Sequence, residues 1–148
     1  MQVWQSIVAA AALAAVCVVA GAGLEDEDIR GLDAEANGIR DDVDAWIAGQ
    51  RFSAPQRLAA QQLARALQAT FLLDPGNARA VLDAAEAAKQ GVKCVIARRT
   101  TSAAGYRTVL DIEAITANSA PRKRAYRAYN AKLNGTVSRS PEGDGCEV

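Results

Sequence analysis

The most informative feature of this 148-residue chain is an absence, because it contains no histidine. Without an imidazole there is no Ser-His-Asp triad, no common general base and none of the usual zinc sites. Three cysteines, one of them inside an apolar N-terminal run, do not make a structural zinc centre by themselves. A glycine-rich phosphate loop after a strand is also missing. The sequence therefore predicts no enzyme, no metal site and no cofactor.

Aromatic side chains are scarce as well, at 5% of the residues, whereas alanine occurs 33 times. Alanine favours helix because it loses no side-chain entropy on entering one. It also makes for a thin core, since each alanine buries little apolar area. A chain of this length corresponds to about one domain. We predict an all-α fold, a small bundle of four or five short helices after an N-terminal apolar leader, with a flexible C-terminal tail.

Charge is missing from the first 24 residues, where apolar side chains surround the whole helix circumference. A core helix would show a polar stripe, so residues 1–23 are predicted to be a signal peptide or an N-terminal membrane anchor. Small residues at 20–22 fit a signal-peptidase site, and the run is shorter than the roughly 20 residues that span a bilayer. The lack of Lys and Arg before residue 7 favours an anchor instead, with membrane contact through residues 3–23.

Both forms of the leader predict an exported protein. Four consecutive acids, residues 25–28, follow the apolar run, and this charge difference favours a C-terminal part outside the cytoplasm. We expect a periplasmic or secreted protein, or one anchored in the inner membrane with its C-terminal part outside the cytoplasm. The helical domain is expected to span residues 24–135.

The first helix of that domain is predicted from apolar residues that recur at a spacing of three and four. They are Ile29, Leu32, Ala36, Ile39, Val43 and Trp46. This spacing is typical of an amphipathic helix packed on its own domain, and also of a short coiled coil. Gly49 is expected to end the helix.

Two further helices are predicted from a capping residue with proline at the start of the helix. Ser53-Ala54-Pro55 begins a helix to about Leu73, and Asp74-Pro75 begins one to about Gln90, with Gly91 as its stop. The expected buried positions are Leu63, Leu67 and Phe71 in the first helix and Val81, Leu82, Ala85 and Ala88 in the second.

The stretch 92–99 is β-branched and fits a strand or a helix, and we expect a helix because a lone strand has no partner in this chain. Another helix is predicted near residues 106–117. Ser119-Ala120-Pro121 then caps the last helix, which is expected to end at Asn134-Gly135. Its buried stripe is predicted to be Ala125, Tyr126, Tyr129 and Leu133.

The C-terminal residues 136–148 are rich in Ser, Gly, Pro and acids and are predicted to form a mobile tail. Cys94 and Cys146 are the only cysteines outside the leader, and an oxidising compartment rarely leaves such a pair free. We therefore predict a disulfide between them, which ties the tail back to the body. A bridge between two Cys146 residues of different chains is the rival.

Charge is distributed unevenly, with nine acids against two bases in residues 25–44 and five bases without an acid in residues 122–132. The basic residues Arg122, Lys123, Arg124 and Arg127 are a candidate interaction surface for acidic lipid or an acidic protein. Alternatively the two segments face each other inside one fold. Tyrosines among these bases would suggest nucleic-acid contact in the cytosol, but we expect no nucleic acid as partner of an exported chain.

Glu113 is the one carboxylate that the sequence marks for possible acid-base chemistry, because it stands alone on an apolar helix face. Asp111 lies two residues away and points to a different face of the helix. A cell-wall hydrolase would need Glu113 buried in a cleft. A solvated surface carboxylate is the simpler interpretation, so no catalytic residue is predicted.

By elimination, the sequence favours a small non-enzymatic exported protein that acts through protein–protein interaction, such as an inhibitor, immunity or assembly accessory factor. Its partner would be a protein of the cell envelope. In layout the chain also resembles the inner-membrane spanin subunit of tailed phages. The shared features are small size, an apolar N-terminal segment, a helical exported part and cysteines at mid-chain and near the end. That resemblance implies a membrane-anchored structural protein, although Pro55, Asp74-Pro75 and Gly91 interrupt the long coiled coil that a spanin needs.

Overall fold

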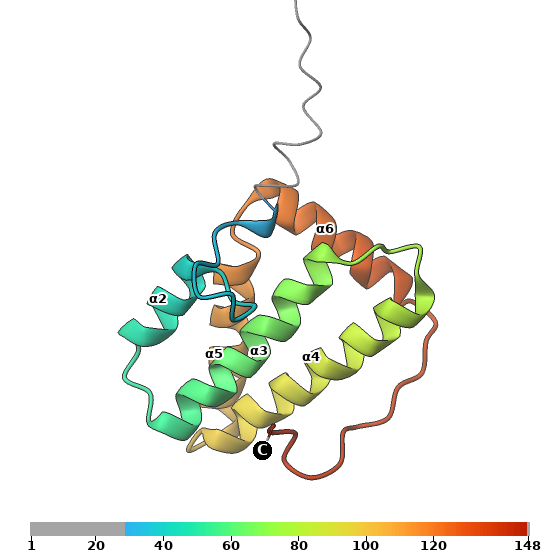
Figure 1. The fold of residues 1–148 in the computed structure, drawn as a ribbon. Coiled ribbons are helices and arrows are strands. Elements are labelled where there is room, and N and C mark those ends of the chain that lie inside the picture. Colours follow the sequence, from blue (N-terminus) through green and yellow to red (C-terminus); the bar gives the residue numbers. More distant parts are fainter. Residues whose placement is uncertain (1–28, 148) are drawn as a thin grey trace, which may run out of the picture.

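The computed structural model describes residues 29–147 as an all-helical bundle (Figure 1). No strand occurs among these residues, so the predicted all-α bundle is confirmed. The leader predicted for residues 1–23 lies outside this range. The helices are α2 (Asp41–Gly49), α3 (Ala54–Leu72), α4 (Ala78–Arg98), α5 (Ser102–Thr116) and α6 (Ala120–Lys132). None of the helices between residues 29 and 147 combines the length and apolar composition needed to cross a bilayer.

The two longest helices, α3 and α4, run antiparallel side by side, with α5 and α6 packed behind them (Figure 1). Helix α2 lies against the N-terminal half of α3. After α6 the chain turns back, passes along the outer side of α4 and ends beside its C-terminal end (Figure 1). We call this last segment, residues 136–147, the C-terminal strap.

The core is centred on α3, whose predicted stripe of Leu63, Leu67 and Phe71 is buried. Small alanines on the same helix let its neighbours approach closely, which is how a chain poor in aromatics still excludes water. The buried cluster consists of Ile39, Val43, Ile47, Ala59, Ala60, Leu63, Ala64, Leu67, Cys94, Val95 and Ile112.

Local capping explains where α3 and α6 begin. The backbone N–H of Ser53 donates to Oε1 of Gln56 at 3.0 Å, one half of the capping box that opens α3. The hydroxyl of Ser119 accepts from the N–H of Arg122 at 3.4 Å at the start of α6. Both helix starts were predicted from the sequence and are confirmed.

The helix predicted from residue 29 to Gly49 is wrong in its first part, although α2 does end at Gly49. Residues 29 and 30 are helical, but regular helix resumes only at Asp41. Positive φ angles at Gly31 (66°), Ala36 (53°) and Gly38 (81°) break the backbone between them. The predicted apolar positions Ile39 and Val43 are both buried, but Ile39 reaches the core from a loop and not from a helix.

Helix α4 also differs from the prediction at both ends. Asn77 caps it by accepting from the N–H of Ala80 at 3.1 Å, whereas Asp74 binds the N–H of Gly76 in the preceding turn. The helix does not stop at Gly91 but continues to Arg98, so residues 92–98 are helical as expected. Leu82, expected to face inward, is 49% exposed.

Candidate functional site

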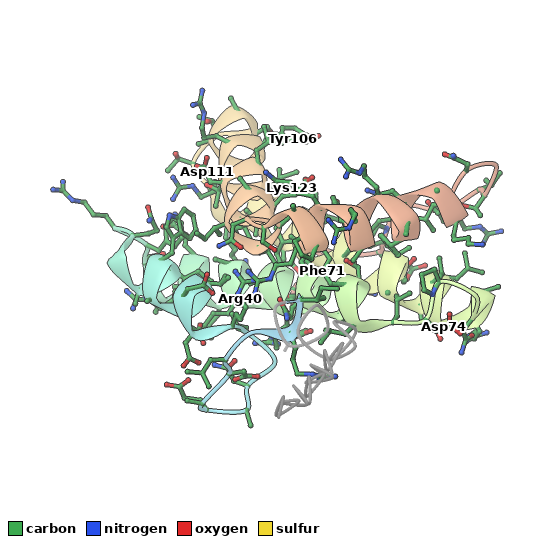
Figure 2. All side chains as sticks on the ribbon, turned by 90° about the horizontal axis from the view of Figure 1, so that it is seen from above. Arg40, Phe71, Asp74, Tyr106, Asp111 and Lys123 are labelled. Carbon is green, nitrogen blue, oxygen red and sulfur yellow. A yellow bond between two sulfur atoms is a disulfide. The ribbon has the colours of Figure 1, made fainter. Side chains whose placement is uncertain are left out.

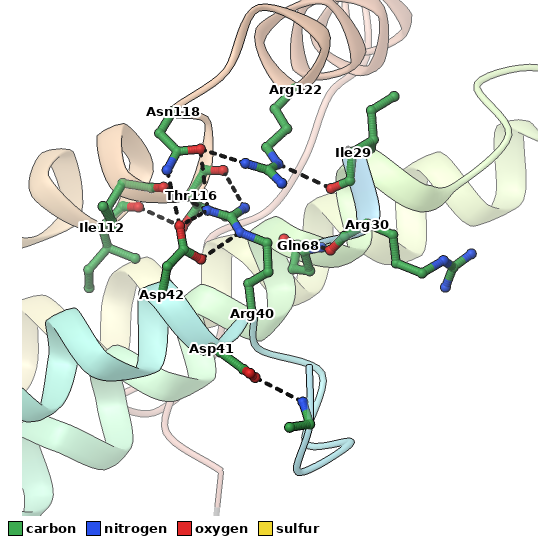
Figure 3. A network of polar contacts seen from close by, with 12 residues as sticks. Ile29, Arg30, Arg40, Asp41, Asp42, Gln68, Ile112, Thr116, Asn118 and Arg122 are labelled. Atoms are coloured by element: carbon green, nitrogen blue, oxygen red, sulfur yellow. Dashed lines mark hydrogen bonds and ion pairs between the residues drawn. The ribbon is translucent and has the colours of Figure 1, made fainter. Parts of the chain in front are cut away.

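A polar network at the junction of α2, α5 and α6 is built around the buried guanidinium of Arg40 (Figure 3). Its Nε donates to Asp42 at 2.6 Å, and its Nη1 donates to the backbone oxygen of Thr116 at 3.0 Å. Asn118 joins the network by donating to Asp42 at 3.1 Å and accepting from Arg122 at 2.7 Å. The network therefore fastens the N-terminal part of the chain to the α5–α6 connection.

The carboxyl group of Asp42 is held in its charged form by this network. Burial acts to raise its pKa, but hydrogen bonds and positive charge from Arg40, with help from Asn118 and Arg122, outweigh burial and lower the pKa below 3.8. Arg122 is itself buried and donates to the backbone oxygen of Ile29 at 3.2 Å. Arg122, in the first turn of α6, thus contacts residue 29 through a backbone oxygen, whereas Lys123, Arg124 and Arg127 are exposed.

Residues 33–44 gather carboxylates in a small space. They comprise the loop before α2 and the first turn of α2, and we call them the loop 33–44. One oxygen from each of Asp33, Glu35 and Asp41 lies within 4.8 Å of the other two. The carboxylate of Asp33 accepts from the N–H groups of Asn37 at 3.0 Å and Gly38 at 2.9 Å. Asp44 closes the loop, because its Oδ2 accepts from the Asn37 side chain at 2.6 Å.

The spacing within this loop is that of a twelve-residue calcium loop. Oxygen-bearing side chains stand at positions 1, 3, 5, 9 and 12, and Gly38 takes the sharp turn at position 6. The side chains in order are Asp33, Glu35, Asn37, Asp41 and Asp44. The carbonyl oxygen of Ile39 stands at position 7. The loop departs from the usual pattern by Glu at position 3 and by Asp at position 12, where Glu is usual.

The sequence analysis predicts no metal site and does not single out this spacing. The same residues carry a three-four apolar spacing, which was interpreted as a helix. A helix would scatter these side chains around its circumference, whereas the backbone found here, with positive φ at Ala36 and Gly38, turns Asp33, Glu35 and Asp41 toward one another. Arg57 and Gln61 of α3 border the hollow beside the loop.

A second candidate site is a cleft of about 1050 Å³ between α4 and α6. Leu63 and Leu67 of α3 form its floor, Val92 belongs to the α4 wall and Tyr129 to the α6 wall. The beginning of the C-terminal strap, residues 136–141, completes the outer wall. This volume is at the upper end of the range of small-molecule sites, about 300–1,000 Å³.

The tyrosines of α6 belong to this cleft and to the core beneath it. Tyr126 stacks on Tyr129 with ring centroids 6.1 Å apart, and it meets the edge of Phe71 at 5.7 Å. Burial, and then the nearby negative charge of Tyr126 if it ionises, raise the pKa of Tyr129 to about 12. The prediction that these rings are core rather than a stacking platform agrees with the 3% exposure of Tyr129.

Glu113 is half-buried and lines the same cleft, next to Tyr126. Burial and the negative charge of Glu113 raise the pKa of the Tyr126 hydroxyl. Asp111 is exposed, and Tyr106 and Asp111 project from different sides of α5 (Figure 2). The two acids singled out in the sequence therefore do not act as a pair.

The disulfide predicted between Cys94 and Cys146 is present, with the two Cα atoms 4.7 Å apart. The strap is fastened at further points as well. Nε2 of Gln62 donates to the Gly145 carbonyl at 2.8 Å, and Arg98 pairs with Asp144 at 2.8 Å. The pKa of the Asp144 carboxyl is lowered, mainly because it accepts a hydrogen bond from the backbone N–H of Cys146. The positive charge of Arg98 lowers this pKa further.

The basic residues proposed as an interaction surface divide into two groups. Lys123, Arg124 and Arg127 are exposed, and Lys123, labelled in Figure 2, borders a hollow between α5 and α6 together with Arg127. Arg122 is 7% exposed and belongs to the polar network, so the structure corrects its assignment to that surface.

Comparison with protein families, with curated proteins and with solved structures finds no match for this chain. The candidate sites therefore rest on their own geometry and chemistry.

Proposed function

We propose that this protein is a non-enzymatic, calcium-binding helical protein that works outside the cytoplasm and acts by binding a partner protein. The observation that carries the calcium assignment is the loop 33–44, where three carboxylates converge and the ligand spacing is that of a calcium loop. Carboxylate, amide and carbonyl oxygens are the ligands that this hard cation prefers. Asp33, Glu35 and Asp41, whose carboxylate oxygens converge, would hold the ion, and the spacing adds Asn37, Ile39 and Asp44 as further candidate ligands.

The disulfide supports an exported location, and the proposed calcium site is compatible with it. Disulfides persist in oxidising compartments, and the Cys94–Cys146 bond joins the C-terminal strap to α4. Calcium sites of extracellular modules work at about 10⁻⁴–10⁻³ M, an affinity that suits a single loop with imperfect ligands. Whether the leader is a signal peptide or an anchor does not alter this proposal.

A protein of the cell envelope is the partner we propose. The exposed bases Lys123 and Arg127 place positive charge beside the hollow between α5 and α6, and this charge would attract an acidic partner surface. The spanin-like alternative is less well supported, because the longest described helix, α4, has 21 residues and packs within a bundle. The hydrolase alternative would be established by clearing of cell-wall substrate that is lost in Glu113→Gln.

Calcium binding is tested by calorimetric titration of the full chain with CaCl2, together with thermal unfolding in calcium and in EGTA. We expect one ion per chain, with a dissociation constant on the order of 10⁻⁴ M. The melting temperature should rise with calcium, because a ligand that binds only the folded state stabilises it.

The variant Glu35→Gln is chosen because Glu35 is exposed and its removal leaves the Asp33 and Asp41 bonds to the loop backbone in place. It should lose the calcium effect while keeping the melting temperature measured in EGTA. Asp111→Asn on α5 is the matched control and should behave like the wild type. If calcium gives neither heat nor a shift in melting temperature, the assignment is wrong.

A further inference from the structure

The cleft between α4 and α6 has the shape and lining of a site for a hydrocarbon chain. Partly exposed apolar side chains line it, among them Val92 of α4 and Val109 of α5, and polar side chains such as Asn130 and Ser138 complete the lining. Large apolar side chains also stand exposed at its edge, where Leu82 is 49%, Tyr106 is 59% and Val137 is 98% exposed. A bound apolar chain would remove this surface from water, which is the main source of affinity in such sites.

Two lysines of α4 face the strap that forms the outer wall of the cleft. Lys89 donates to the Arg139 carbonyl at 2.9 Å, and its charge is matched by Glu86 at 2.7 Å. Lys93 donates to the carbonyl oxygen of Pro141, which is a neutral acceptor. The ammonium group of Lys93 therefore offers a positive charge at the wall of an apolar cleft.

The opposite wall has the reverse polarity. Glu113 and Tyr126 line the cleft on the side of α5 and α6, and a carboxylate there repels an anionic group. An anionic ligand would consequently place its head at the α4 side, near Lys93. The two walls thus favour one orientation of a ligand with a single charged end.

We propose that this cleft binds one single-chain anionic amphiphile of the fatty-acid type. The hydrocarbon tail lies along Leu82, Val92 and Val109, and the acidic head pairs with Lys93. A partner helix of about 10–12 Å diameter would require the strap to move, and the strap is fixed at Cys146 by the disulfide. A hydrocarbon chain is narrower and does not require that movement. This inference rests on the cleft alone and is independent of calcium binding.

The test is displacement of a fluorescent fatty acid from the full, oxidised chain by palmitate, in EGTA so that calcium soaps do not form. We expect saturable binding of one palmitate per chain. Lys93→Gln should weaken palmitate binding about tenfold or more and leave hexadecanol binding unchanged, because only the acid uses the ammonium group. Lys132→Gln, a matched loss of charge at the C-terminal end of α6, should change neither.

A second variant tests the tail site. Ala85 lines the cleft, so the larger side chain of Ala85→Phe should obstruct part of it and weaken the binding of palmitate and of hexadecanol by the same factor. The helical spectrum and the melting temperature check that the variant folds. Absence of saturable palmitate binding to the wild type would overturn the proposal. So would equal weakening of acid and alcohol by Lys93→Gln, or stoichiometric binding of an amphipathic peptide that palmitate does not displace.

Discussion

Gly91 of α4 meets the backbone of Leu63 of α3 so closely that a Cβ atom at position 91 would lie 2.8 Å from the Leu63 Cα. Helix α4 therefore crosses α3 at a point where only hydrogen fits. Backbone cannot yield as the end of a flexible side chain does, so the two helices would have to separate. This crossing sets how closely the two longest helices pack and fixes the floor of the cleft.

Gly91→Ala should destabilise the protein by about 1–2 kcal/mol, although alanine is the better helix former by about 1 kcal/mol. The loss arises because the added methyl group pushes α4 away from α3. Gly49→Ala is the matched control, since nothing lies within 4 Å of a Cβ at the end of α2. The control should leave stability unchanged or raise it slightly. Urea denaturation of both variants measures the difference, and a stabilised Gly91→Ala would contradict the close crossing.

The Arg40–Asp42 pair should give the protein an acid-sensitive contribution to stability. Because the folded-state pKa of Asp42 lies below its ordinary value of 3.8, the contribution is fully present above about pH 4 and is lost as pH falls through the folded pKa. Asp42→Asn should therefore flatten the dependence of the unfolding free energy on pH in that acidic range. A wild-type slope that persists in the variant would show that other carboxylates are responsible.

Asp42→Ala should have a larger effect at neutral pH, because it leaves the guanidinium of Arg40, 3% exposed, without its carboxylate. We expect a loss of about 2 kcal/mol, the usual value for a hydrogen bond to a charged group. The exposed pair Arg79–Asp83 provides the control. Asp83→Ala there should change stability by less than about 1 kcal/mol.

The disulfide between Cys94 and Cys146 should stabilise the fold chiefly by restricting the unfolded chain. With 52 residues of separation, the chain-entropy relation gives about 4 kcal/mol. Urea denaturation of the oxidised protein and of Cys146→Ser should show this difference, while Ser138→Ala on the same strap should not. On non-reducing electrophoresis the wild type should migrate as a compact monomer. A dimer band that disappears on reduction would instead support an intermolecular bridge.

The sequence by itself determined those features that depend on interactions three or four residues apart. Ser53 with Gln56, and Ser119 with the N–H of Arg122, start their helices through contacts inside one turn, so the pattern of residues was sufficient. The disulfide followed from counting, because only two cysteines remained outside the leader. The ligand spacing of the loop 33–44 was also present in the sequence, but it overlapped a helical apolar pattern that predicted something else.

Some residue types have two structural roles, and only the tertiary structure shows which role a given residue takes. Glycine ends helices and also permits close crossings, and the backbone of Leu63, distant in sequence, made Gly91 a crossing. Arginine is normally exposed because burying its charge is unfavourable. Arg122 is buried, and Asn118 and the Ile29 carbonyl, 93 residues away, accept hydrogen bonds from it. The cleft likewise exists only once four helices and the strap are assembled. The sequence contains the residues that line the cleft, but the shape of the cleft depends on how the helices pack.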